Sequence, residues 1–158
     1  WSSDVCSSDL AAARVMPGTA AMLSRRKGET SVGLLTNPSV NLEYGQSFIE
    51  RVRDMSETGG LLPKVIAAYN AGPLPVGEWN AHTRDNADPL LYIESIPYWE
   101  TRGYVTTVLR NYWMYEVQAG EQAKSLAALS QGLWPRFPGL PGATAVRLSS
   151  GGAIRSAD

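Results

Sequence analysis

Cysteine and histidine are scarce in this sequence, and their scarcity excludes two kinds of site. The 158 residues include one cysteine, Cys6, and one histidine, His82. A single cysteine cannot form a disulfide within the chain, and one cysteine with one histidine is too few to enclose a zinc ion. We therefore expect no metal site of soft ligands and no cofactor. His82 stands among polar residues, so we expect it to be solvated and assign it no role.

The sequence also lacks an excess of charge of either sign. Its 14 Lys and Arg residues stand against 15 Asp and Glu residues, and the net charge is −1. Proteins that bind nucleic acids through the phosphate backbone present a basic surface, which this composition does not supply. We therefore expect no nucleic-acid partner.

Long apolar runs are missing as well. Stretches such as residues 65–69 and 126–129 are far shorter than the roughly 20 residues that cross a bilayer. The sequence predicts no membrane-spanning helix, and it leaves association with a membrane open.

The two ends of the chain differ from its middle, which has the length of one domain. Residues 1–10 (WSSDVCSSDL) nearly repeat one short polar string and have no initiator Met and no apolar core of a signal peptide. They resemble a translated sequencing-adapter remnant, and the alternative is a disordered polar leader. Residues 132–158 contain eight Gly and Pro residues, which predicts an extended tail docked by aromatics such as Trp134. We expect the domain itself at residues 11–131.

Between these ends the apolar positions recur at helical spacing. No segment alternates apolar and polar residues between hairpin turns, so strands have no strong candidate and we expect an all-α fold. The sequence predicts helices at residues 17–28, 41–59, 63–70, 88–95 and 97–118, and a weaker one at 121–130.

Three segments carry the most specific signal in the sequence. Residues 15–20 read VMPGTA, residues 67–73 read AAYNAGP and residues 93–105 read IESIPYWETRGYV. Their wording, order and spacing together resemble the soluble lytic murein transglycosylase family, whose SLT domain cleaves peptidoglycan. The resemblance covers roughly residues 14–118.

This resemblance implies a fold, a substrate and a location. The fold is a lysozyme-like helical domain of the goose-type lysozyme and transglycosylase kind, in the periplasm or cell envelope. The partner is the peptidoglycan glycan strand of N-acetylglucosamine (GlcNAc) and N-acetylmuramic acid (MurNAc). The reaction is non-hydrolytic cleavage of the MurNAc–GlcNAc β-1,4 bond, which leaves a 1,6-anhydro-MurNAc end.

In the family that this chain resembles, one glutamate of a Glu-Ser pair acts first as the acid and then as the base. That pair lies further upstream of the proline that matches Pro17 than this sequence extends. Residues 11–14 (AAAR) also depart from the Gly-Leu-Met-Gln that is usual in the family. We therefore expect the catalytic glutamate to lie upstream of residue 1, the domain to be incomplete at its N-terminus, and the chain to be inactive as given.

The resemblance assigns substrate contacts to Met16, Tyr69, Asn70, Glu100 and Tyr104. Each has a structural alternative. The methionine and the two tyrosines are of types that commonly fill a core. Asn70 ends a predicted helix, and Glu100 opens one, where an acid favours the helix dipole.

Three further residues of the third segment have open roles. Tyr98 and Trp99 are either platforms on which sugar rings stack or core aromatics. Glu94 is either a solvated acid or a buried partner of Arg102. Neither Glu94 nor Glu100 occupies the catalytic position of the motif.

Two alternative functions remain beside a transglycosylase. The chain could be a peptidoglycan-binding module that never had the catalytic acid. It could also be a goose-type lysozyme that hydrolyses the same bond, although the Ile-Pro-x-x-x-Thr pattern of residues 96–101 fits the transglycosylases better.

Overall fold

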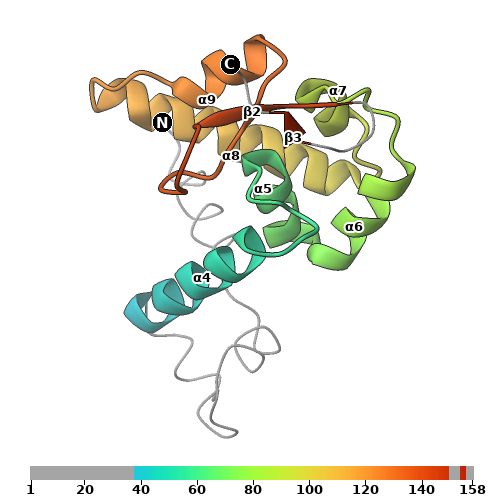
Figure 1. The fold of residues 1–158 in the computed structure, drawn as a ribbon. Coiled ribbons are helices and arrows are strands. Elements are labelled where there is room, and N and C mark those ends of the chain that lie inside the picture. Colours follow the sequence, from blue (N-terminus) through green and yellow to red (C-terminus); the bar gives the residue numbers. More distant parts are fainter. Residues whose placement is uncertain (1–37, 150–153, 156–158) are drawn as a thin grey trace, which may run out of the picture. The chain divides into compact units, whose positions relative to one another are not determined.

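The computed structural model describes residues 38–149 and 154–155 of the chain. The chain divides into two compact units, residues 1–51 and 52–158. The helix predicted at 17–28 and the residue Met16 lie outside the described residues. The elements of the described part are α4 (Pro38–Arg53), α5 (Leu62–Ala71), α6 (Pro73–His82), α7 (Pro89–Glu94), α8 (Trp99–Gln118), α9 (Lys124–Ser130), β1 (Trp134–Pro135), β2 (Ala145–Leu148) and β3 (Ile154–Arg155) (Figure 1).

Helix α4 ends six residues before the predicted end at residue 59. The hydroxyl of Thr58 donates to the carbonyl oxygens of Val52, Arg53 and Met55. Val52 and Arg53 belong to the last turn of α4 and Met55 follows it, and the Met55 carbonyl also accepts from the Gly59 N–H at 3.0 Å. Thr58 therefore closes the helix end from five residues downstream of Arg53.

Helix α5 is the buried element around which the second unit is built, and the sequence predicted it. Pro63 stands in its first turn, where the missing N–H costs nothing, and Gly72 ends it with φ +91°. Ala67 and Ala68 are fully buried in it. It packs against α8, α6 and β1 (Figure 1).

Helix α6 was not predicted. Proline cannot continue the helix predicted at residues 63–70, but Pro73 is also the first residue of the next helix. Proline is favoured there because its ring fixes φ at a helical value and its missing N–H is not needed. Val76 and Trp79 bury one face of α6, and the Trp79 ring meets the Tyr98 ring edge to face at 5.2 Å between centroids.

Helices α7, α8 and α9 confirm the three helices predicted after residue 87, with small shifts of their ends. Asp88 caps α7, because its carboxylate accepts from the backbone N–H groups of Leu90 and Leu91 at 2.8 and 3.0 Å. Between α7 and α8, the Arg102 guanidinium donates to the Ile96 carbonyl at 2.8 Å. Glu94 is exposed and forms no ion pair with Arg102 among the described residues, so the solvated alternative holds for this acid.

The structure contains a small sheet for which the sequence offered no strong candidate strand. Three short antiparallel strands form a sheet of order β1-β2-β3, with Trp134 opposite Val146 and Arg147 opposite Arg155. A strand of two residues is too short to show alternation, and Pro135 and the glycines around it hid the pattern. The all-α class is confirmed for the described helices, with this small sheet added to it.

Trp134 fastens β1 to the helices of the second unit. Its side chain is 0% exposed, and its indole N–H donates to the Ala87 carbonyl at 2.7 Å. Its ring meets Tyr92 at 5.3 Å, and the Lys64 ammonium lies 4.9 Å from its centre. Burial lowers the pKa of Lys64, and the two ring faces and Asp85 offset part of that cost. The expected docking of the C-terminal segment by an aromatic therefore holds for Trp134.

Candidate functional site

The end of α5 and the start of α8 enclose a hollow of about 470 Å³, which we call the α5–α8 hollow. Two of the predicted site residues line it, Asn70 from α5 and Glu100 from α8. They are far apart in sequence and meet because α5 packs against α8. The remaining lining residues are Ala71, Pro97, Tyr98, Trp99 and Thr101.

A hydrogen bond between α8 and α5 positions the amide of Asn70. Thr101 is 2% exposed, and its hydroxyl donates to Asn70 Oδ1 at 2.7 Å. Since Oδ1 accepts this bond, the Nδ2 group of the exposed Asn70 can serve a ligand as a donor. The structure thus shows that Asn70 also joins the end of α5 to the start of α8.

The aromatic side chains of the hollow are open to solvent. Trp99 is 81% exposed and Tyr98 is 53% exposed. Large aromatics that belong to a core would be buried, so the core alternative is wrong for Trp99. Glu100 is exposed in the first turn of α8, where it also favours the helix dipole.

The structure does not bring all predicted residues into this hollow. Tyr69 and Tyr104 are half-buried and do not line it, although each lies within a turn of a residue that does. Burial raises the pKa of Tyr69 above its ordinary value, so its phenol is protonated near neutral pH. Met16 lies outside the described residues.

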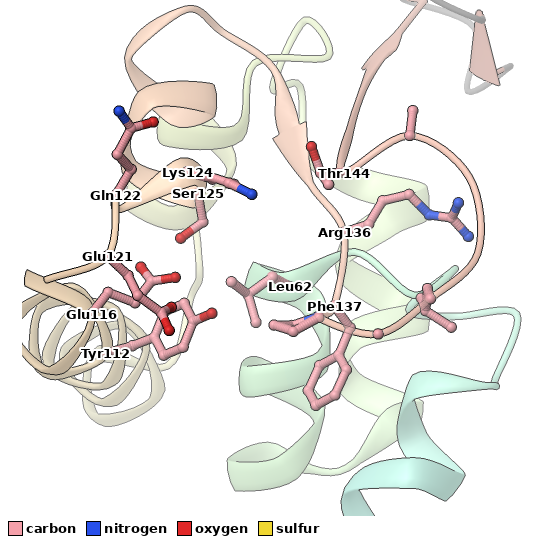
Figure 2. A pocket seen from close by; sticks show the side chains of 14 residues that line it. Leu62, Tyr112, Glu116, Glu121, Gln122, Lys124, Ser125, Arg136, Phe137 and Thr144 are labelled. Carbon is pink, nitrogen blue, oxygen red and sulfur yellow. The ribbon is translucent and has the colours of Figure 1, made fainter. Parts of the chain in front are cut away.

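A second pocket, of about 660 Å³, was not predicted at all (Figure 2). We call it the α8–α9 pocket. It is formed by the C-terminal half of α8, the start of α5, the turn into α9 and the segment between β1 and β2. Its charged and aromatic lining residues are Tyr112, Glu116, Glu121, Lys124, Arg136 and Phe137.

The acidic side of the α8–α9 pocket perturbs a tyrosine. Burial, then a hydrogen bond to the Glu116 carboxylate, and then the negative charges of Glu116 and Glu121 raise the pKa of Tyr112 to about 12. The phenolate would be both desolvated and close to two negative charges, so the neutral form is favoured. Tyr112 is therefore a hydrogen-bond donor at neutral pH.

The described residues show neither a metal centre nor a membrane span. Within residues 38–149 and 154–155, no three His, Cys, Asp or Glu side chains gather closely enough to hold a metal ion. No helix in that part of the chain combines the length and the apolar character needed to cross a bilayer.

Comparison with known proteins decides the family. The transglycosylase SLT domain family matches residues 10–91, which is more than half of the chain. The chain belongs to the transglycosylase SLT domain family. The resemblance to this family is thereby confirmed, and the match includes the first two of the three sequence segments.

Individual relatives of this SLT domain carry the same family name. The soluble lytic murein transglycosylase of Escherichia coli K12 is 33% identical over 122 residues, which are 75% of this chain and 19% of the relative. That of Salmonella typhimurium is 32% identical over 126 residues, which are 78% of this chain and 19% of the relative. The chain therefore spans about a fifth of the length of these relatives. No solved structure matches it significantly.

The family match ends at residue 91 and so includes Asn70 of the α5–α8 hollow but not residues 97–101. The α8–α9 pocket falls almost wholly beyond residue 91, with Leu62 as its one lining residue inside the match. The sequence pointed to the hollow through motif residues on both of its sides. It held no comparable signal for the pocket, whose sides are joined only by the folding of the chain.

Proposed function

We propose that this SLT domain binds the peptidoglycan glycan strand in the α5–α8 hollow. The observation that carries the proposal is the hydrogen bond from Thr101 to Asn70, which presents an amide beside the exposed carboxylate of Glu100. Support also comes from the family, whose relatives are named lytic murein transglycosylases.

The chemistry of the hollow suits an amino sugar. The Asn70 amide can donate to a hydroxyl or N-acetyl oxygen, and the Glu100 carboxylate can accept from a hydroxyl or an amide N–H. The exposed face of Trp99 offers an apolar platform for the C–H side of a sugar ring. We assign substrate contacts to Asn70 and Glu100 in the hollow, and keep Met16, Tyr69 and Tyr104 as predicted contacts of the same strand.

We propose further that the parent enzyme cleaves the MurNAc–GlcNAc bond non-hydrolytically in the cell envelope, and that this chain as given does not. Glu100 is the one acid that lines the hollow in the described residues, and it is exposed to solvent. A general acid for this reaction needs an apolar, water-poor wall that keeps its proton in place. From the family resemblance alone, we propose that the catalytic glutamate lies upstream of residue 1.

The test is digestion of purified sacculi with mass spectrometry of the released fragments. We expect no 1,6-anhydro fragments from the 158-residue chain, and release once the upstream segment of its gene is added. Release by the 158-residue chain at the rate of the extended one would contradict the assignment of the acid.

The same digestion separates the alternative functions. If the extended chain also releases nothing but binds sacculi, the domain is a peptidoglycan-binding module. If the released ends are heavier by one water than anhydro ends, the reaction is lysozyme-like hydrolysis.

A further inference from the structure

The segment that follows α9 crosses the starts of two helices. We call residues 134–140 the strap, which begins with β1. The indole N–H of Trp134 donates to the Ala87 carbonyl at 2.7 Å, two residues before α7 begins. The backbone N–H of Phe137 donates to the Gly60 carbonyl at 2.7 Å, two residues before α5 begins (Figure 2). The strap therefore joins the starts of α5 and α7.

The turn before α7 has an unfavourable backbone conformation. Asn86 and Ala87 have φ values of 50° and 63°, which lie in the left-handed region. A Cβ atom disfavours this region, and alanine has no polar side chain that could compensate by a local hydrogen bond. The N–H of Ala87 donates to Asp85 Oδ1 at 2.9 Å, and its carbonyl accepts from Trp134. One of these two bonds at Ala87 thus comes from the strap.

The contact of the strap before α5 requires a glycine. Gly60 has φ +69°, and a Cβ atom at this position would lie 2.7 Å from Cδ1 of Leu140, at the far end of the strap. Carbon atoms do not approach so closely, so a side chain here would displace Leu140. The neighbouring Gly59 has φ +55°, but a Cβ atom there would meet nothing within 4 Å. The two glycines share a left-handed backbone, and they differ in this contact with the strap.

The other ends of α5 and α7 reach the α5–α8 hollow. Asn70 and Ala71 end α5 and line the hollow, and Pro97 lines it three residues after α7 ends. Ile96 is 1% exposed, and its carbonyl accepts from the Arg102 guanidinium at 2.8 Å. The path from α7 to the hollow is therefore closely packed, and such packing transmits displacements. A shift of one helix start against the other would change the distance between the walls of the hollow.

We propose that the strap fixes the starts of α5 and α7 against each other and thereby keeps the α5–α8 hollow in the shape that binds glycan. This step rests on the proposed function. The strap supplies none of the residues that line the hollow, so it acts through the two helices. Trp134 and Leu140 are its positioning residues. Because coupling between two sites is reciprocal, glycan in the hollow must in turn hold the strap in place.

Hydrogen exchange of indole protons, followed by NMR in the 158-residue chain, tests this coupling. Trp134 is 0% exposed, so its indole proton exchanges only when the strap opens. We expect a saturating peptide-free GlcNAc–MurNAc tetrasaccharide to slow this exchange at least about fivefold. The Trp113 indole donates to Ser125 Oγ at 2.9 Å, outside the strap, and its exchange should change less than about twofold. Equal slowing of both protons, or no slowing at Trp134, would overturn the coupling.

The strap must also open separately from the rest of its unit. The backbone amide of Leu109 lies in the middle of α8, and this residue is 2% exposed. We expect the Trp134 indole proton to exchange faster than this amide, after correction for their intrinsic rates. Equal corrected rates would mean that the strap opens only when the whole unit unfolds, which would contradict the proposal.

Two glycine variants test the contact of the strap before α5. Gly60→Ala places a Cβ atom against Leu140, so we expect the Trp134 indole proton to exchange about tenfold faster. Gly59→Ala is the matched control, because it has a left-handed backbone without that contact, and the expected change is below about threefold. Equal effects of the two variants would refute the role of the strap. If Gly60→Ala does not fold, Leu140→Ala removes the same contact without backbone strain, and an unchanged exchange rate in that variant would refute it.

Failure of this proposal and failure of the proposed function are distinguishable. Binding of the tetrasaccharide without slower exchange at Trp134 would contradict the coupling and leave the proposed function standing. Absence of tetrasaccharide binding would contradict the proposed function. The response of the Trp134 indole proton to Gly60→Ala would then still decide whether the strap holds the two helix starts together.

Discussion

Thr101 Oγ1 donates a hydrogen bond to Asn70 Oδ1 at 2.7 Å and thereby joins the first turn of α8 to the last turn of α5. The hydroxyl is buried while the asparagine is exposed, so the bond links the interior of the unit to its surface. Glu100 precedes Thr101 and is positioned by the same turn. The proposed glycan contacts therefore depend on how α5 and α8 pack.

Replacing Thr101 by valine tests the structural role of this bond. Thr101→Val keeps the shape of the side chain and removes the donor, so we expect a loss of about 1 kcal/mol in the free energy of unfolding. Glycan binding should weaken as well, because the Asn70 amide is no longer held. The measurements are urea unfolding and titration with the glycan tetrasaccharide.

Thr106→Val is the matched control, since Thr106 is exposed and its hydroxyl bonds only to carbonyls of its own helix. It should change stability by less than about 0.5 kcal/mol and leave glycan binding unchanged. Equal losses in both variants would argue against a special role of the Asn70–Thr101 bond.

Removing Trp134 should destabilise the second unit strongly. Trp134→Ala deletes a fully buried ring and its hydrogen bond to Ala87, and leaves Lys64 and Tyr92 beside a cavity. We expect a loss of about 3–5 kcal/mol, measured by urea unfolding. Trp99→Ala removes an exposed ring of the same kind and should cost less than about 0.5 kcal/mol. Similar losses would contradict the buried position of Trp134.

The raised pKa of Tyr112 predicts a dependence of stability on alkaline pH. The ordinary pKa of tyrosine is 10.0 and that of folded Tyr112 is about 12, so the folded state holds this proton more tightly. The resulting stability is fully present below about pH 10 and is lost as the pH rises toward 12.

Tyr112→Phe cannot ionise and should lose less stability over the same interval. Thermal unfolding of both proteins at the two ends of that pH range gives the comparison, in which contributions of other groups cancel. Parallel loss in the two proteins would show that Tyr112 is not buried beside its two acidic neighbours.

Helices could be predicted from the sequence where particular residues mark their first and last turns. Pro63 and Gly72 bound α5, and Asp88 caps α7, because each residue acts on its own helix end. Pro73 misled the prediction, since the same residue type follows one helix and begins the next. The strands could not be predicted because Trp134 pairs with Val146 across a loop that carries no strand pattern of its own.

The two candidate sites also differ in how far they could be predicted from the sequence. The α5–α8 hollow could be predicted from the sequence because its two sides coincide with the two motif segments that contain Asn70 and Glu100. The α8–α9 pocket could not be predicted, because Glu116 and Arg136 lie in stretches without a motif and line one pocket only after folding. The exposure of Trp99, which decides between platform and core, also follows from packing alone.

The central claim, that the α5–α8 hollow binds the glycan strand, is tested most directly by backbone amide shifts of the 158-residue chain during titration with a peptide-free GlcNAc–MurNAc tetrasaccharide. We predict saturable shifts concentrated at Asn70 and at residues 98–101, about tenfold weaker binding for Asn70→Ala, and no change for Glu94→Gln. Absence of saturable shifts at these positions, or equal binding by Asn70→Ala and the parent chain, would contradict the account.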